Sequence, residues 1–191
     1  MSEIFKAHIN KFATVSDEEF EDILSYFQFK SILKKDNLLE EGQVCKSNVF
    51  VLKGILRKFF INEKGTEQTT EFAIENWWIT ETFSFINQSY TEFYIQAVEN
   101  TELLHIDKTA YEKLLETHPV MEKYFRCIYQ KAYAAAQMRI KFLYDFSREE
   151  LYYHFLRVQP EFLQRVPQYL IASYLNFTPE YLSEIRKKGI S

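Results

Sequence analysis

Apolar residues near the start of the chain recur at the spacing of an α-helix. Within residues 17–27, "DEEFEDILSYF", the apolar side chains fall on one face. Ser16 precedes this run and Glu19 follows three residues later, which is the pattern of a capping box. The sequence therefore predicts a helix that begins after Ser16. Its predicted buried residues are Phe20, Ile23, Leu24 and Phe27.

From about residue 28 the pattern changes to short runs that are rich in β-branched and aromatic residues. One example is "NVFVLKGILRKFFINEKG", residues 48–65, and further runs continue to residue 107. Pairs such as Glu41-Gly42 and Lys64-Gly65 separate the runs and are typical of turns. Strands this short, without helices between them, predict an antiparallel sandwich or roll.

A long helix is predicted from Pro119 to about residue 144, after a shorter helical run at 109–118. Its apolar residues step by alternating four and three positions, which is the heptad spacing of a helix that packs against a second helix. Arg139 interrupts the series once. We predict a dimerisation helix, and the alternative is a helix that packs only on the predicted sheets. The predicted dimer contacts are Phe125, Ile128, Ala132 and Ala135.

Two short helices joined by a tight turn are predicted in "PQYLIASYLNFTPEYLSEIRKKG", residues 167–189. Ala172 is small enough for a close helix crossing, and Asn176 tolerates the left-handed backbone of a tight turn. Thr178 can cap the second helix, and Pro179 suits its first position. This order of residues predicts a helix-turn-helix motif.

The outward face of the second helix decides whether this motif reads DNA. Glu180 can accept a hydrogen bond from a cytosine amino group, so one acidic residue is compatible with base reading. Glu184 places a second carboxylate on the same face, which is unfavourable near a polyanion. A small helical bundle that only closes off the fold is therefore an open alternative. The predicted DNA-contacting residues are Thr178, Glu180, Tyr181, Ser183, Glu184, Arg186, Lys187 and Lys188.

Composition and charge narrow the class of protein. The 191 residues are 47% hydrophobic and 17% aromatic, which supports a sizeable packed core. The net charge of −4 is uneven, because residues 1–110 hold 11 Lys/Arg and 18 Asp/Glu, whereas residues 111–191 hold 12 and 9. A contact with a polyanion is therefore expected at the carboxyl end of the chain.

Candidate chemistry for an enzyme or a metal site is sparse. Cys45 and Cys127 stand far apart and form no CxxC pair, and the four histidines lack HxH or HExxH spacing. We expect no metal, no cofactor and no enzymatic activity. The sequence also has no long apolar run and no apolar signal core, which predicts a cytoplasmic protein without a membrane partner.

In this order the predicted elements resemble the Crp/Fnr superfamily of bacterial transcription regulators. The most specific likeness is "RVPQYLIASYLNFTPEYLSEIRKK", residues 165–188, which is similar to the carboxyl end of short members. The resemblance implies an α+β fold whose N-terminal antiparallel β-roll, similar to a cyclic-nucleotide-binding domain, covers residues 1–118. A long central dimerisation helix would cover residues 119–145, and a small C-terminal helix-turn-helix domain residues 146–191.

The same resemblance implies a homodimer on double-stranded promoter DNA with two-fold-related half-sites. The helix Pro179–Lys188 of each subunit would enter the major groove, and RNA polymerase is a further candidate partner. The alternative is a degenerate regulator that acts as a dimeric protein-interaction module without DNA binding.

The nucleotide cassette of the family has a Gly-Glu pair that is followed later by Arg-Ser. At the matching positions this chain has Thr80-Glu81 and Thr91-Glu92. The charge-assisted donor to the phosphate is absent, and a carboxylate stands beside the expected phosphate. Cyclic AMP is therefore not expected in the usual pose, and the roll either senses an unknown small molecule or serves as a structural and dimerising body. The candidate ligand-pocket residues are Glu81, Thr82, Thr91 and Glu92.

The second departure from the family lies in the reading helix. Related members usually carry Arg at the position of Glu184. Only the residues "EFLQR" separate Pro160 from the terminal helix pair, which leaves little room for the wing strands of larger members. Both departures predict weak and strongly salt-dependent DNA binding.

Overall fold

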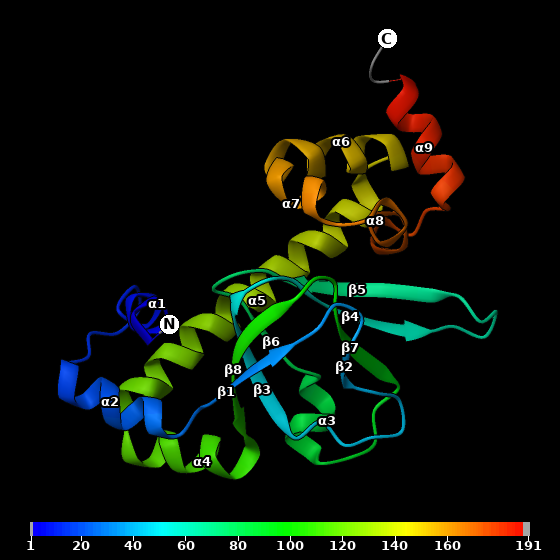
Figure 1. Cartoon of the computed structure of the whole chain (residues 1–191). Helices are drawn as coiled ribbons and strands as arrows, with labels where there is room; N and C mark the ends of the chain where they lie inside the picture. Colours follow the sequence, from blue (N-terminus) through cyan, green and yellow to red (C-terminus); the bar gives the residue numbers. More distant parts are fainter. Residues whose placement is uncertain (1, 189–191) are drawn as a thin grey trace. The chain divides into compact units, whose positions relative to one another are not determined.

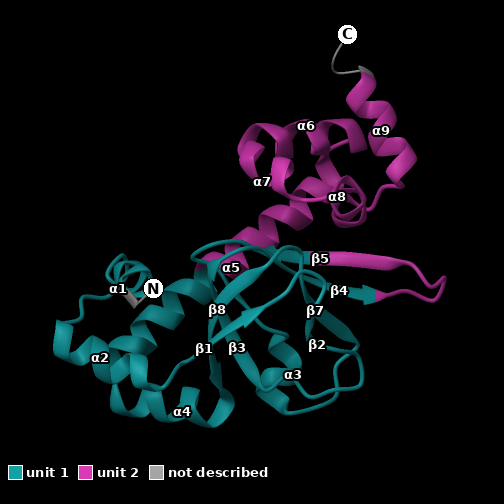
Figure 2. Ribbon diagram, in the orientation of Figure 1, with its two compact units in different colours: residues 1–60, 71–130 teal, residues 61–70, 131–191 magenta. Residues whose placement is uncertain are grey.

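The computed structural model describes residues 2–188, and its elements are drawn in Figure 1. The helices are α1 (Ser2–Ile9), α2 (Asp17–Ser25), α3 (Thr82–Asn87), α4 (Lys108–Thr117), α5 (Pro119–Asp145), α6 (Arg148–Val158), α7 (Pro160–Arg165), α8 (Gln168–Leu175) and α9 (Pro179–Lys188). The strands are β1 (Gln28–Ile32), β2 (Asn37–Leu39), β3 (Ser47–Lys53), β4 (Leu56–Ile61), β5 (Glu67–Ala73), β6 (Trp78–Ile79), β7 (Phe93–Ala97) and β8 (Thr101–Asp107). Figure 2 divides the chain into two compact units: unit 1 holds residues 1–60 and 71–130, and unit 2 holds residues 61–70 and 131–191.

Two four-stranded antiparallel sheets form the roll. The first sheet has the strand order β1-β8-β3-β6, and the second has the order β2-β7-β4-β5. In the first sheet Phe50 of β3 pairs with Leu104 of β8, and in the second Lys58 of β4 pairs with Ile95 of β7. The predicted α+β fold with an N-terminal antiparallel roll is confirmed.

Strand β3 shows how the apolar pattern makes this roll. Side chains alternate across a strand, so a strand with apolar residues at successive positions buries both of its faces. Val49 and Val51 join the inner core between the two sheets, whereas Phe50 and Leu52 join a second core against the helices. The inner core consists of Ile32, Leu39, Cys45, Val49, Val51, Leu56, Ala73, Ile79, Phe85, Ile95, Ala97 and Leu103.

Helices α1, α2, α4 and the first turns of α5 supply the second core. Helix α2 begins as predicted, because the Ser16 hydroxyl accepts a hydrogen bond from the Glu19 backbone N–H at 3.1 Å. Helix α1 was not predicted from the sequence, yet its Phe5 and His8 are buried. The hydroxyl of Tyr124 lies 2.7 Å from His8 Nδ1 and ties α1 to α5.

Unit 2 contains the four C-terminal helices and the tip of the β4–β5 hairpin. Ser147 and Glu150 form the capping box that their spacing predicts at the start of α6. The run "EFLQR" belongs to helix α7, and the described residues 146–188 contain no β-strand. The carboxyl-terminal domain is therefore helical and has no wing strands in this part of the chain.

The hairpin tip is tied to the first helix of the predicted helix-turn-helix. The Thr69 N–H donates to Ser173 Oγ at 2.8 Å, and that hydroxyl donates to the Glu67 carbonyl at 2.7 Å. Arg139 donates to the Thr70 carbonyl and, at 2.9 Å, to the Tyr174 carbonyl. These bonds join three segments of unit 2: the hairpin tip, α5 and α8.

Candidate nucleic-acid interface and ligand cassette

Helices α8 and α9 are joined by the tight turn that the sequence predicts. Asn176 ends α8 with a backbone φ of 60°, in the left-handed region that Asn tolerates better than most residues. The Phe177 N–H then donates to the Ala172 carbonyl at 2.8 Å, which satisfies a carbonyl at the end of the helix. Thr178 Oγ1 accepts from the Tyr181 N–H at 3.2 Å and caps α9.

The inner face of this pair is closely packed. Ala172 is fully buried, and Leu182 and Ile185 are each only 1% exposed. The small side chain of Ala172 lets the two helices approach, and the apolar residues of α9 fill the space beside it. The Tyr153 hydroxyl donates to the Ile185 carbonyl at 3.3 Å and links α9 to α6. Helices α8 and α9 are therefore two short packed helices joined by a tight turn, as the sequence predicts.

The outer face of α9 carries most of the residues predicted to contact DNA. Glu180 and Glu184 are one turn apart and exposed, so both carboxylates lie on the same face of the helix. Tyr181 is half-buried, because its ring packs edge-on against Phe177 at 5.5 Å between centroids. Thr178, Arg186 and Lys187 are exposed and Ser183 is half-buried, while the side chain of Lys188 lies outside the described atoms.

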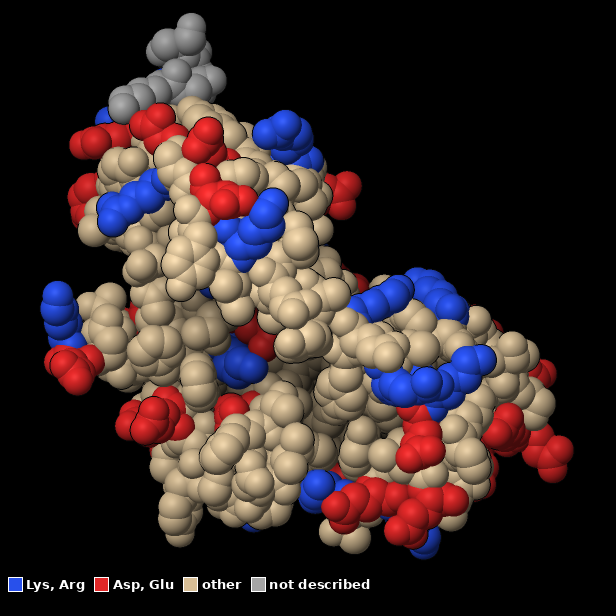
Figure 3. Space-filling view, turned by 180° about the vertical axis from the view of Figure 1, so that it is seen from behind, with Lys and Arg blue, Asp and Glu red and all other residues tan. Residues whose placement is uncertain are grey.

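Residues 146–191, called the helical unit below, carry mixed charges rather than a uniformly basic surface. They contain six Lys/Arg and five Asp/Glu, a balance of +1. Figure 3 shows basic and acidic side chains intermingled over the surface of this unit on the face in view. Such a surface attracts a polyanion weakly, and any DNA contact depends on the few cations of α9.

Helix α3 lies in the stretch that the sequence comparison predicts to be the nucleotide cassette, and Glu81 is its N-cap. One carboxylate oxygen accepts from the Phe83 N–H at 3.1 Å, and the other accepts from the Ser84 N–H at 2.7 Å. Glu81 is 8% exposed. Both of its oxygens are thus engaged by the chain itself, where a nucleotide-binding carboxylate would face a ribose.

The other three candidate pocket residues do not converge with Glu81. Thr91 is buried, and its hydroxyl accepts from the Phe93 N–H at 3.0 Å. Thr82 and Glu92 are exposed. The structure therefore places two of the four candidates in the internal hydrogen-bonding of the roll and two on its surface.

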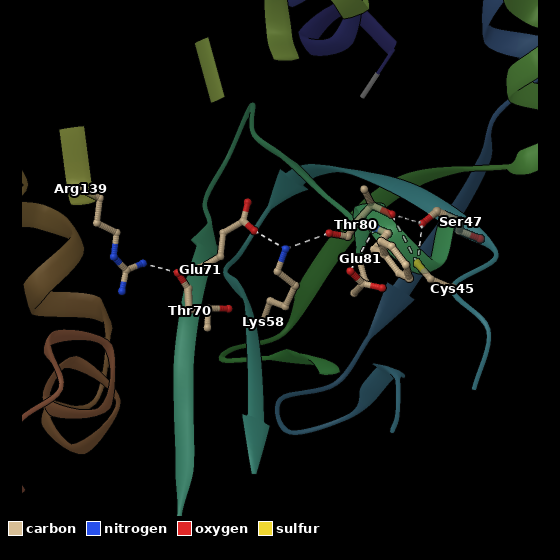
Figure 4. A network of polar contacts seen from close by, with 9 residues as sticks. Cys45, Ser47, Lys58, Thr70, Glu71, Thr80, Glu81 and Arg139 are labelled. Carbon is tan, nitrogen blue, oxygen red and sulfur yellow. Dashed lines mark hydrogen bonds and ion pairs between the residues drawn. The ribbon is translucent and has the colours of Figure 1, made fainter. Parts of the chain in front are cut away.

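A lysine beside the cassette was missed in the sequence. Lys58 of β4 donates to the Thr80 carbonyl at 3.1 Å and forms an ion pair with Glu71 of β5 at 2.6 Å, as Figure 4 shows. The sequence of β4 could have indicated this lysine. Lys58 follows the inward-facing Leu56 by two positions, so its side chain lies on the same face of the strand. Lys58 supplies a cation near the cassette, but Glu71 neutralises it.

Polar contacts continue on both sides of this pair. Thr80 Oγ1 donates to the Ser47 carbonyl at 3.1 Å and lies 3.4 Å from Cys45 Sγ. Next to Glu71 in the chain, Thr70 accepts the hydrogen bond from Arg139 (Figure 4). Because Thr70 and Glu71 are consecutive residues, the single strand β5 takes part in both sets of contacts.

The predicted seam of α5 is divided between buried and exposed positions. Phe125 is buried in the core of unit 1, and Ile128 packs against that core. Ala132 and Ala135 are exposed. An exposed apolar series runs one position later along the helix, again in steps of three and four. Its members are Tyr133, Ala136, Ile140 and Leu143, with Tyr133 67% and Ile140 55% exposed.

Residues 2–188 contain no group of three or more His, Cys, Asp or Glu that is placed to hold a metal ion. Among the helices of the same residues, none combines the length and the apolar character needed to cross a membrane.

Comparisons with known proteins match one part of the chain to a domain family. Residues 29–118 match the family described as "Cyclic nucleotide-binding domain". A comparison with curated protein sequences gave no match.

Solved structures resemble the chain beyond this domain. FixK2 from Bradyrhizobium japonicum has a TM-score of 0.72 at 15% identity, covering 85% of this chain and 83% of its own. The c-di-GMP responsive global regulator CLP of Xanthomonas campestris has a TM-score of 0.71 at 17% identity, covering 88% of both chains. The catabolite activator protein of Thermus thermophilus has a TM-score of 0.58 at 19% identity, covering 91% of this chain and 83% of its own.

At these identities the structural likeness shows the fold alone. The α+β fold expected from the resemblance is confirmed: residues 29–118 match the cyclic nucleotide-binding domain model, and the chain shares its fold with these solved structures.

Proposed function

We propose that the protein is a homodimeric DNA-binding transcription regulator of the Crp/Fnr type. The helix Pro179–Lys188 of each subunit enters the major groove of a two-fold-related promoter site. The observation that carries this proposal is the build of α8 and α9: a left-handed Asn176 turn, a capped second helix and a buried crossing at Ala172. This build leaves one face of α9 polar and exposed.

The comparisons support the same class of function. The structures that share the fold include a catabolite activator protein and a regulator that links cell–cell signalling to virulence gene expression. A regulator of gene expression is therefore among the proteins that share this fold.

The dimer contact proposed here uses the exposed face of α5. Tyr133, Ala136, Ile140 and Leu143 form an apolar strip at heptad spacing, and a strip of this kind is stable in water when a second helix covers it. Ala136 leaves room for close approach of the partner helix. The strip lies one residue later than the seam predicted from the sequence. Of that seam, Phe125 and Ile128 contribute to the core of unit 1, whereas Ala132 and Ala135 are exposed.

Cyclic AMP is proposed not to operate this regulator in the usual pose. The ribose carboxylate Glu81 already caps α3 with both oxygens, and Thr91 supplies no positive charge for a phosphate. Lys58 is the cation of the network beside the cassette, and it is paired with Glu71. A nucleotide would have to break these contacts before it formed its own.

The proposed DNA complex is weak and sensitive to salt. Glu180 and Glu184 stand on the face that meets DNA, and the helical unit has a charge balance of only +1. Each phosphate that a protein cation neutralises contributes ~0.9 to the slope of log K against log salt. With few cations on α9, we expect a slope of about two to three per subunit, set by Arg186, Lys187 and Lys188 at about one contact each.

Fluorescence anisotropy with the labelled DNA upstream of the protein's own gene tests the proposal at low salt. The expected result is saturable binding by a dimer that weakens as salt rises. Lys187→Gln is expected to lower the salt slope by about one, since one phosphate contact is lost. A stable dimer that binds no DNA at low salt would instead support the protein-interaction module.

A further inference from the structure

A cavity of about 460 Å³ opens among strands that belong to both sheets of the roll. Its walls come from β1, β2, β3, β7, β8 and the segment that joins β2 to β3. This volume lies within the ~300–1,000 Å³ that is usual for small-molecule sites. The cavity adjoins the cassette, because the N–H of its lining residue Cys45 donates to Ser84 Oγ at 2.8 Å. Its described lining nevertheless includes none of Glu81, Thr82, Thr91 and Glu92.

The floor of the cavity is apolar. Leu39, Val49, Ile95 and Leu103 line it, and each of them belongs to the inner core of the roll with an exposed fraction of 4% or less. These residues come from four different strands, so the floor is fixed by both sheets rather than by a loop. It is suited to the hydrocarbon part of a ligand.

The rim of the cavity carries positive charge. Lys30 and Lys46 are exposed and His105 is half-buried, and all three line the opening. Burial and the nearby Lys30 hold the pKa of His105 below its usual value, while Asp107 acts in the opposite direction. The lining as described contains no Asp or Glu. This local excess of cations lies in a segment, residues 1–110, whose Asp/Glu outnumber its Lys/Arg by 18 to 11.

We propose that this cavity binds a small apolar carboxylic acid, with the carboxylate at Lys30 and Lys46 and the hydrocarbon tail on the floor formed by Leu39, Val49, Ile95 and Leu103. A cationic rim above an apolar floor is complementary to an anionic amphiphile. It is less suited to a cyclic nucleotide, whose sugar and base require polar partners deep in the site. The inference rests on the cavity alone and is independent of DNA binding.

Isothermal titration calorimetry with decanoate, below its aggregation concentration, tests the site. Saturable binding of one decanoate per chain is expected. Affinity should rise along the series hexanoate, octanoate and decanoate by ~fourfold per methylene, which is ~0.8 kcal/mol per buried methylene converted at 1.36 kcal/mol per tenfold. Decanol, which lacks the charge, and inorganic phosphate, which lacks the tail, should both bind more weakly than decanoate.

Two double variants locate the carboxylate. Lys30→Gln with Lys46→Gln removes both rim charges, and about tenfold weaker decanoate binding is expected, since exposed ion pairs contribute ~0.2–1 kcal/mol each. Lys11→Gln with Lys34→Gln removes the same charge from exposed positions that do not line the cavity, and it should leave the affinity unchanged. Circular dichroism checks that both variants are folded.

Cys45 provides a separate readout inside the site, because this buried residue lines the cavity. In a Cys127→Ser variant, decanoate is expected to slow alkylation of Cys45 severalfold. The proposal is overturned if decanoate shows no saturable binding at millimolar concentration. Equal loss of affinity in the two double variants, or alkylation of Cys45 at an unchanged rate, would place the ligand elsewhere and also overturn it.

Discussion

Substituting Glu184 by arginine tests the placement of α9 against DNA. Glu184 is exposed, lies one turn after Glu180 and contributes nothing to the buried side of the helix pair. Its replacement changes the charge of the reading face by +2 and leaves the packing of Ala172, Leu182 and Ile185 intact. The fold should therefore be unaffected, and DNA affinity should change.

The expected magnitude follows from the exposure of this position. A bidentate arginine contact to guanine contributes ~1–3 kcal/mol of discrimination, and a phosphate contact adds ~0.9 to the salt slope. Because Glu184 is exposed to solvent, we expect the lower part of that range: ~1–2 kcal/mol, or about 5- to 30-fold tighter binding at low salt. The gain should fall as salt rises, since the Debye length shortens to ~10 Å at 0.1 M.

Fluorescence anisotropy titrations at several salt concentrations measure both quantities. Glu161→Arg is the matched control, because it makes the same charge change at an exposed position on α7, away from the reading face. A general electrostatic effect would tighten binding equally in both variants. Unchanged affinity of the Glu184→Arg protein at low salt would refute the placement of this residue near DNA.

Three further predictions follow from the geometry. The double variant Tyr133→Glu with Ile140→Glu should sediment as a monomer, because dimerisation would bury two charges on the apolar strip of α5. The control Ala134→Glu, at an exposed position outside the strip, should remain a dimer. A double variant that still sediments as a dimer would contradict the assigned face. Asn176→Val should destabilise the helical unit by ~1–2 kcal/mol in urea unfolding, since a β-branched residue resists the left-handed backbone, and an unchanged midpoint would show that the turn can relax. Glu81→Ala should destabilise the roll by ~0.5–2 kcal/mol, because the two N–H groups of α3 lose their acceptor; full stability would mean that the carboxylate does not serve as a cap.

Local signals predicted much of the fold. The caps at Ser16 and Thr178 and the turn at Asn176 depend on the residue itself and its immediate neighbours, and all three lie where the sequence placed them. The strands of the roll were predicted for a similar reason. Consecutive apolar residues in β3 indicate a strand that is buried on both faces, as it is in the structure. The helix pair α8 and α9 is the part of the candidate site that such signals predict best.

The orientation of α5 and the ion pair of Lys58 depend on long-range packing, which the sequence did not predict. Two heptad series, offset by one residue, run along α5, and periodicity alone does not say which one faces the chain's own core. Phe125 and Ile128 pack inward because α1, α2 and β3 bring apolar partners from distant parts of the sequence. The ion pair of Lys58 and Glu71 likewise depends on the pairing of β4 with β5, which no local pattern specifies.

Selection of bound fragments from random double-stranded DNA tests the central claim most directly. The account predicts enrichment of a palindrome whose half-sites lie about one helical turn apart, ~10 bp from centre to centre, or a multiple of that spacing. Such a site would report the dimer, the reading helix and DNA binding together. Recovery of no enriched sequence by a folded, dimeric protein at low salt would contradict the assignment of α8 and α9 as a DNA-reading motif.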